Sequence, residues 1–490
     1  MSNAKLDAIS SLITSLSKSE KRHFKLYANR ITNSKDSLYI QLFNHIEYAP
    51  NHKDAQVKNK LKFKNTSQYV NTKRHLYRQI LKSLRLLYSK KHAQIAVNEE
   101  IDYATILAHK NLYHDSYEYL ERLDLPLNEH YTQNLLTVTE LKRRIASNIQ
   151  LTTNDYDNII GQTRVQLEID WEIDDLFNEL KKDFALLGYT RNEREKTLRQ
   201  ERFLNKINSF QYKKLSKLQQ YNFHTLKILY FKNTCNYREV YRNALHQFEL
   251  LSAIPYHKNE GHHINLTVNC IKQILEVCYI NKNKNKFNKW HSVLTAKIDL
   301  YNTTKDKHGG TIIELEEYLF LYNYIINDNY KCQIDNLYKP FEQNLHLQLL
   351  RSQYLANQGK LLEALDIINK LLNLKNIPGE LALYARLHQV LFHYRLYHFE
   401  LVKNLLPQLR LAFKTSGHFN KTISAVLTTT SKGVKALDFG MKDEINELLE
   451  KLKVYSKTTF ENIPFLYFDF YNWFEAVKLN INVSELNKQT

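Results

Sequence analysis

Apolar side chains recur every three or four residues along most of the chain, which is the spacing that one face of an α-helix requires. The first such helix is predicted over residues 4–16, with apolar positions at Leu6, Ile9, Leu12, Ile13 and Leu16. A capping box, Ser17-Lys18-Ser19-Glu20, follows it and indicates where a second helix begins, because Ser and Glu can each accept the other's backbone N–H. Further helices are predicted over residues 37–48, 54–63 and 66–90.

From about residue 95 onward the pattern changes to repeated helical hairpins. The clearest turn is at Gly359, where a helix ends on a residue that adopts the left-handed conformation at low cost; Glu363 and small Ala364 open the next helix. Similar turns are predicted at Asn111–Asp115, Asn236–Glu239, Tyr397–Glu400 and Gly440–Glu444, with weaker ones near Asp155, Asn288 and Lys331. The acidic residues at 115, 239 and 363 are each 124 positions apart, which equals three units of about 41 residues.

Residues 351–373 resemble a tetratricopeptide repeat in the Gly359 turn and the Glu363-Ala364 pair. Together with the opening Leu16–Tyr27, the whole chain is similar to uncharacterised helical-repeat proteins of Bacteroidota, a resemblance that implies a fold but no activity. The sequence therefore predicts an all-α chain. We expect a basic helical module over residues 1–92, and over 93–490 a right-handed helical-hairpin solenoid of irregular, tetratricopeptide-like units of about 40 residues.

Composition is consistent with this fold class. Ten Gly and seven Pro in 490 residues are too few for the many tight turns of an all-β chain. The four cysteines have neither a metal-binding nor a redox spacing, so we expect buried thiols in a reducing compartment. No segment approaches the ~20 apolar residues that cross a bilayer, and the N-terminus lacks the apolar run of a signal peptide. We therefore expect a cytoplasmic protein without membrane insertion.

The basic charge is concentrated in the first 92 residues, which hold 19 Lys and Arg against 5 Asp and Glu, a net charge of +14 out of +18 for the chain. Such an excess favours a polyanionic or acidic partner. On the helical wheel of residues 66–90, four cations fall within an arc of roughly 80°. An adjoining apolar arc is predicted to face the core and consists of Val70, Leu76, Tyr77, Ile80, Leu81, Leu84, Leu87 and Tyr88. The candidate nucleic-acid-binding residues are Lys58, Lys60, Lys62, Lys64, Arg74, Arg78, Lys82 and Arg85.

Two alternative roles for this basic stripe stay open. Many charged helix faces are only solvated, although they usually mix signs because oppositely charged pairs four residues apart stabilise a helix. The acid-rich segment Glu168–Asp175 is an internal alternative, since it can pair with the basic module. If the stripe binds nucleic acid, helices 54–63 and 66–90 form a helix-turn-helix-like pair joined by Lys64-Asn65.

No pattern in the sequence predicts catalysis or a cofactor. A Gly-rich phosphate loop, a His-Glu-x-x-His run and a Ser nucleophile elbow are all missing from the sequence. The loop Pro255–His263 holds three His and a Glu, but their spacing matches no known metal site, so we interpret it as a connecting loop. The aromatic-rich last helix, introduced by Asn462-Ile463-Pro464-Phe465, is interpreted as the closing element of the array rather than as a ligand platform.

The sequence therefore predicts a non-enzymatic interaction protein. In the favoured interpretation the basic module binds nucleic acid or a ribonucleoprotein particle, and the solenoid groove binds a protein partner. The alternative is a protein–protein scaffold or adaptor whose basic end docks an acidic protein or the chain's own acidic segment. No cofactor, metal or catalytic residue is expected.

Overall fold

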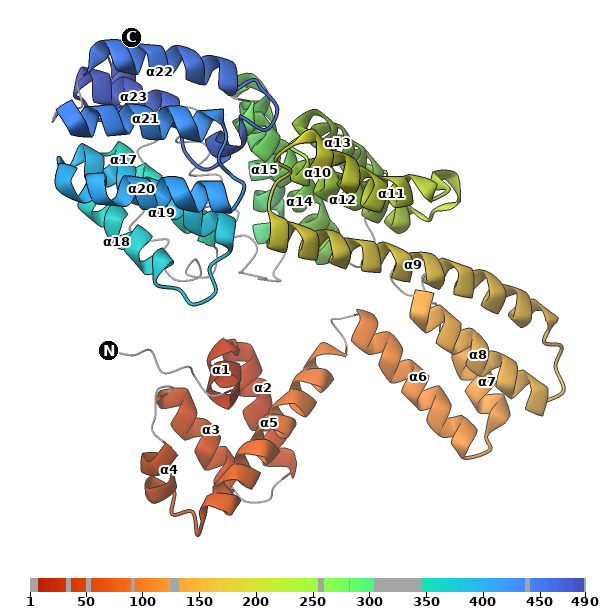
Figure 1. Cartoon of the computed structure of the whole chain (residues 1–490). Helices are drawn as coiled ribbons and strands as arrows, with labels where there is room; N and C mark the ends of the chain where they lie inside the picture. Colours follow the sequence, from red (N-terminus) through yellow and green to blue (C-terminus); the bar gives the residue numbers. More distant parts are fainter. Residues whose placement is uncertain are drawn as a thin grey trace. The chain divides into compact units, whose positions relative to one another are not determined.

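The computed structural model describes residues 8–31, 37–49, 54–89, 93–123, 132–253, 260–281, 283–303, 345–436 and 441–488. All regular elements in these ranges are helical, which confirms the all-α prediction for this part of the chain. The chain divides into two compact units, residues 1–168 and 169–490, and Figure 1 shows their helices coloured along the sequence. The predicted boundary at residues 92/93 lies inside the first unit and stays a prediction.

The N-terminal part of the first unit is a cluster of four short helices and one long one. These are α1 (Ala8–Ser15), α2 (Lys18–Ile31), α3 (Leu38–Tyr48), α4 (Asp54–Lys60) and α5 (Thr66–Tyr88). Their apolar faces share one core, in which Phe24, Phe43 and Leu76 are buried. The predicted capping box is confirmed, since the Ser17 N–H donates to Glu20 Oε2 at 2.6 Å and the Glu20 N–H donates to Ser17 Oγ at 3.2 Å.

Most successive helices beyond residue 92 pack against each other as neighbours. In the first unit they are α6 (Ala93–His109), α7 (Tyr113–Glu121), α8 (Thr132–Asn148) and the first part of α9 (Asn154–Leu187). The second unit contains α10 (Glu193–Arg199), α11 (Asn205–Ser209), α12 (Lys217–Asn233), α13 (Tyr237–Ser252), α14 (Glu260–Ile280), α15 (Lys284–Thr303), α17 (Leu345–Asn357), α18 (Leu361–Leu372), α19 (Gly379–Arg395), α20 (Phe399–Thr415), α21 (Lys421–Ala436), α22 (Lys442–Tyr455) and α23 (Phe470–Leu479). Within each unit this arrangement is that of a helical-repeat array.

One turn geometry recurs between paired helices. Asn111, Cys235, Gly359 and Tyr397 all have φ between +56° and +79°. In each case the next residue donates its N–H to the carbonyl five positions earlier, as Lys360 does to Leu355 at 2.9 Å. This is the Schellman arrangement, which satisfies carbonyls left open at a helix end. The left-handed residue predicted at Gly359 is confirmed, and its counterparts Asn111 and Cys235 keep the 124-residue spacing seen in the sequence.

The loop between α9 and α10 contacts α19 and the residue that directly follows α20. Gly188 has a φ of +68° and lies against Glu380 of α19. The Tyr189 N–H donates to Glu380 Oε2 at 3.3 Å, and Arg191 Nη1 donates to the Ser416 carbonyl at 2.7 Å. These contacts connect helices that lie about two hundred residues apart in the sequence.

The C-terminal segment differs from its predicted form. The expected single helix after Asn462 is instead a 3₁₀ turn, Ile463–Leu466, followed by α23, whose N-cap is Asp469. Proline fits the first turn of either kind of helix, so the sequence signal did not distinguish them. Five of the seven aromatic residues of this segment are buried in the second unit's core, namely Tyr467, Phe468, Phe470, Trp473 and Phe474. These rings therefore pack the core and do not form an exposed ligand platform.

Candidate nucleic-acid interface

The candidate interface is built on α5, whose start and orientation have local causes. Asn65 caps the helix by accepting the Gln68 N–H at 2.8 Å, and Gln68 Oε1 accepts the Lys64 N–H at 2.7 Å. The buried side of α5 holds Tyr69, Leu76, Ile80 and Ser83, which recur at helical spacing and seat the helix on α2 and α3. Seating this side fixes the opposite side toward solvent.

Three cations form a row along the exposed side of α5. Arg74, Arg78 and Lys82 follow one another at four-residue spacing and are all exposed. None of them forms an ion pair with a carboxylate of the described residues. Like charges at this spacing destabilise a helix by about 0.2–0.5 kcal/mol per pair, and no acidic partner offsets that cost in the described residues. We call these three residues the cationic row.

The acidic residues near α5 contact groups other than the cationic row. Five acidic residues precede residue 93, and two of them, Asp7 and Asp36, lie outside the described residues. Glu20 accepts from the Ser17 N–H and from the Tyr88 hydroxyl. Glu47 pairs with Lys25 at 2.7 Å and with Lys21 at 4.0 Å. Asp54 pairs with Lys73 at 3.5 Å and accepts from Tyr69 at 2.8 Å.

The fourth cation of the predicted stripe has a different environment. Arg85 Nη2 lies 2.7 Å from Asp102 Oδ2 on α6, so its charge is largely compensated. Both side chains are more than half exposed, and an exposed pair of this kind is worth about 0–1 kcal/mol. The structure thus separates Arg85 from the cationic row, although all four lie on one helix.

The other four predicted cations gather around the turn between α4 and α5. Lys60, Lys62 and Lys64 are exposed, while Lys58 Nζ lies 5.3 Å from the centre of the Tyr69 ring. The predicted helix 54–63 was too long, because α4 ends at Lys60 and Lys62 adopts a left-handed φ of +53°. The eight candidates therefore form two groups, one around the turn that precedes α5 and one on α5 itself from Arg74 to Arg85.

The apolar arc predicted for α5 is only partly core. Leu76 and Ile80 are buried, but Val70, Tyr77 and Leu81 are 37%, 38% and 44% exposed. The prediction that the whole arc faces the core was therefore wrong for these three. They lie at the edge of the arc next to the cations, where the helices packed on α5 no longer cover them. We call Val70, Tyr77 and Leu81 the apolar edge; the wheel pattern marked its position but not its exposure.

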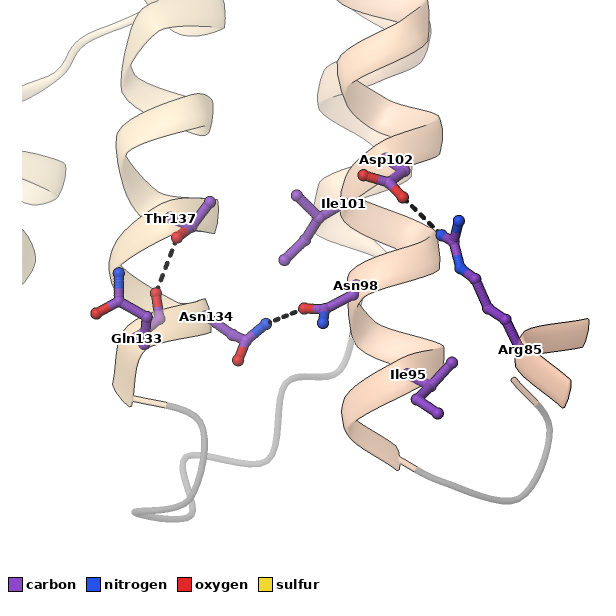
Figure 2. Close-up of a pocket in the computed structure, with 8 residues that line it drawn as sticks. All are labelled: Arg85, Ile95, Asn98, Ile101, Asp102, Gln133, Asn134 and Thr137. Carbon is purple, nitrogen blue, oxygen red and sulfur yellow. Dashed lines mark hydrogen bonds and ion pairs between the residues drawn. The ribbon is translucent and has the colours of Figure 1, made fainter. Parts of the chain in front are cut away.

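Beside the end of α5 lies a groove of about 690 Å³, lined by Arg85, Ile95, Asn98, Ile101, Asp102, Gln133, Asn134 and Thr137. Figure 2 shows its side chains projecting from α5, α6 and α8. Asn134 is buried and donates from Nδ2 to Asn98 Oδ1 at 2.8 Å, linking α8 to α6. The Thr137 hydroxyl donates to the Gln133 carbonyl at 2.9 Å. The groove is therefore rich in amides and close to neutral, and no pattern in the sequence marks it, because its lining residues come from three separate helices.

The acidic segment 168–175 lies in α9. Asp170 is half-buried and accepts from Gln219 Nε2 at 2.8 Å, and burial raises the pKa of its carboxyl group. Glu172, Asp174 and Asp175 are exposed. Docking of this segment on α5 stays a prediction.

The His-rich loop and the cysteines are the remaining candidate sites from the sequence, and their described residues have structural environments. Residues 254–259, including most of the His-rich loop, lie outside the described residues, and His263 Nε2 donates to the Leu251 carbonyl at 2.9 Å. Burial raises the pKa of the Cys270 thiol to about 12 and that of Cys278 to about 11, which makes these thiols poor nucleophiles at neutral pH. Cys332 lies outside the described residues.

No helix in the described ranges combines the length and apolar character needed to cross a membrane.

Comparison with known proteins gives no match: neither a family model, nor a curated protein, nor a solved structure matches this chain.

Proposed function

We propose that the protein binds nucleic acid through the exposed side of α5. The observation that carries this proposal is the cationic row, three exposed cations without an acidic partner among the described residues. At about 1.5 Å of rise per residue, Arg74 and Lys82 are about 12 Å apart along the helix axis. Such a row can contact successive phosphates, which supply most of the sequence-independent affinity of nucleic-acid-binding proteins.

Salt-dependent binding tests the proposal. The full chain should bind labelled RNA, and a variant with Arg74, Arg78 and Lys82 all changed to Gln should bind more weakly. Each phosphate contact contributes about 0.7 to the slope of log affinity against log salt for a single strand, so the slope should flatten by about two. If the triple variant keeps the parent's affinity and slope, the cationic row is only solvated surface.

A matched control removes the same charge elsewhere. Lys206, Lys213 and Lys214 are exposed residues of the second unit, and their replacement by Gln should leave the salt slope close to that of the parent. Equal losses in both triple variants would show a response to net charge rather than to α5.

The same assay separates an external ligand from the internal alternative. If residues 168–175 cover the cationic row, replacing Glu172, Asp174 and Asp175 by their amides should strengthen RNA binding by the full chain, because an attached competitor acts at high effective concentration. We expect little change. A large gain would favour self-docking, and the absence of RNA binding together with capture of an acidic polypeptide would favour the scaffold function.

We also propose that the helical array binds a protein partner, for which the groove beside α6 and α8 is the candidate site. Its exposed Gln133 amide can donate to and accept from the backbone of an extended peptide. Peptides selected from a random library on the full chain should bind more weakly to Gln133→Ala. They should bind Gln162→Ala, on the exposed side of α9, as they bind the parent; unchanged binding to Gln133→Ala would argue against this groove.

The proposal extends to the type of helical repeat and to the cellular compartment of the protein. We take the hairpins to form a right-handed, tetratricopeptide-like solenoid, supported by the repeated Schellman turns and by the contacts between alternate helices such as α17 and α19. A non-catalytic role in the cytoplasm, on RNA or a ribonucleoprotein particle, accords with the buried, weakly acidic thiols of Cys270 and Cys278.

A further inference from the structure

The apolar edge indicates what form of nucleic acid suits α5. On a helix, residues three and four apart are neighbours, with Cβ atoms about 5–6 Å apart. Tyr77 therefore neighbours both Arg74 and Leu81, and Leu81 neighbours Arg78. Cationic and apolar side chains thus lie in two adjoining rows on one exposed surface, and Val70 extends the apolar row by about two turns.

A polyanion bound through phosphates alone would make little use of the apolar row. Single exposed apolar side chains are common on protein surfaces, but Tyr77 and Leu81 are direct neighbours on α5 and lie beside uncompensated cations. In a duplex the base faces are stacked inside, and the outer surface is phosphate and sugar. In a single strand the base faces are accessible, and they stack on aromatic side chains while cations track the backbone.

The position of the row on α5 also disfavours a duplex. A helix that reads the major groove contacts base edges mainly with its N-terminal residues. On α5 the cationic row begins at Arg74, two turns after the helix start, and the exposed residues of the first two turns are uncharged: Thr66, Ser67, Val70 and Asn71.

We infer that α5 binds single-stranded nucleic acid, with phosphates on Arg74, Arg78 and Lys82 and an unpaired base stacked on Tyr77 beside Leu81. This inference rests on the proposed function and names its ligand class. Tyr77 is the residue whose loss distinguishes a single strand from a duplex, because its ring can stack on an unpaired base but adds little to contacts with phosphate.

The test measures binding of fluorescein-labelled oligouridine, and of duplex RNA of equal length, to the full chain by fluorescence anisotropy at fixed salt. Stacking of one base is worth about 1–3 kcal/mol, so Tyr77→Ala should weaken oligouridine binding about 5- to 150-fold. Tyr77→Phe should bind nearly as the parent does, since it keeps the ring. Duplex RNA should bind more weakly than oligouridine and should change less than about twofold on Tyr77→Ala.

The matched control is Tyr48→Ala. Tyr48 is 89% exposed and lies at the end of α3, so its loss should leave both affinities unchanged. Oligouridine binding that is unaffected by Tyr77→Ala, or duplex binding as tight as oligouridine binding, overturns the inference. The triple charge variant distinguishes failure of this inference from failure of the proposed function. If that variant loses binding and Tyr77→Ala does not, the proposed function stands and only the single-strand inference is wrong.

Discussion

A buried histidine should make the stability of the second unit depend on pH. The His388 side chain on α19 is fully buried, with Nε2 donating to the Tyr467 carbonyl at 3.0 Å and Nδ1 3.1 Å from the Ser352 hydroxyl. Burial lowers the pKa of His388 to about 3, against an ordinary value of 6.5, and the neighbouring His346 adds to the decrease. The imidazole is therefore neutral in the folded protein over the whole physiological range.

The size and direction of the effect follow from proton linkage. Below pH 6.5 the unfolded chain takes up a proton on this residue and the folded chain does not, so acid favours unfolding. The stability is complete above 6.5 and is lost by about 1.4 kcal/mol per pH unit on the way toward 3. Between about pH 8 and about pH 5 the loss from His388 is about 2 kcal/mol, a substantial part of a typical unfolding free energy of about 5–15 kcal/mol.

The experiment compares urea unfolding at these two pH values for the parent and for His388→Gln, followed by the fluorescence of tryptophan, since Trp473 is buried in the same core. The variant is less stable throughout, but its loss between the two pH values should be about 2 kcal/mol smaller. His109→Gln, at the exposed end of α6, is the control and should keep the parent's pH dependence. An unchanged pH dependence in His388→Gln would refute the argument that this ring is buried and neutral.

Two further substitutions test the fold, each beside a matched control. Leu365→Ala, in the buried face of α18, should cost about 2–5 kcal/mol in unfolding free energy, whereas Leu362→Ala, 70% exposed on the same helix, should cost little; equal costs would contradict the hairpin register. Gly188→Ala should destabilise by at least about 1–2 kcal/mol, because φ is +68° and the new Cβ would lie 1.8 Å from Glu380 Oε2. The control is Gly161→Ala in α9, where an added Cβ has no other heavy atom within 4 Å. In thermal unfolding of both variants, this control should be neutral or stabilising.

Much of the fold follows from local signals in the sequence. The capping box at Ser17–Glu20 and the left-handed turn at Gly359 are interactions between residues a few positions apart, so the chain specifies them before any tertiary contact forms. The same holds for the three- to four-residue spacing of apolar side chains, which specifies one apolar side on each helix. The position of the four cations on one side of α5 is likewise a property of the helix alone.

What depended on tertiary structure is which helix covers which arc, and which charge meets a partner. Val70, Tyr77 and Leu81 belong to an apolar arc by sequence, but they are exposed because no neighbouring helix reaches them. Arg85 looked equivalent to the cations before it until α6 placed Asp102 beside it.

The same limit applies to groups brought together over long sequence separations. Two hydrogen bonds illustrate this. Asn134 and Asn98 are 36 positions apart in the sequence, and His388 and Tyr467 are 79 positions apart. Periodicity reports only the side of a helix on which a residue lies. The sequence by itself therefore determined the helices, their turns and the concentration of positive charge. Tertiary packing decided which of those charges and apolar side chains remain available to a ligand.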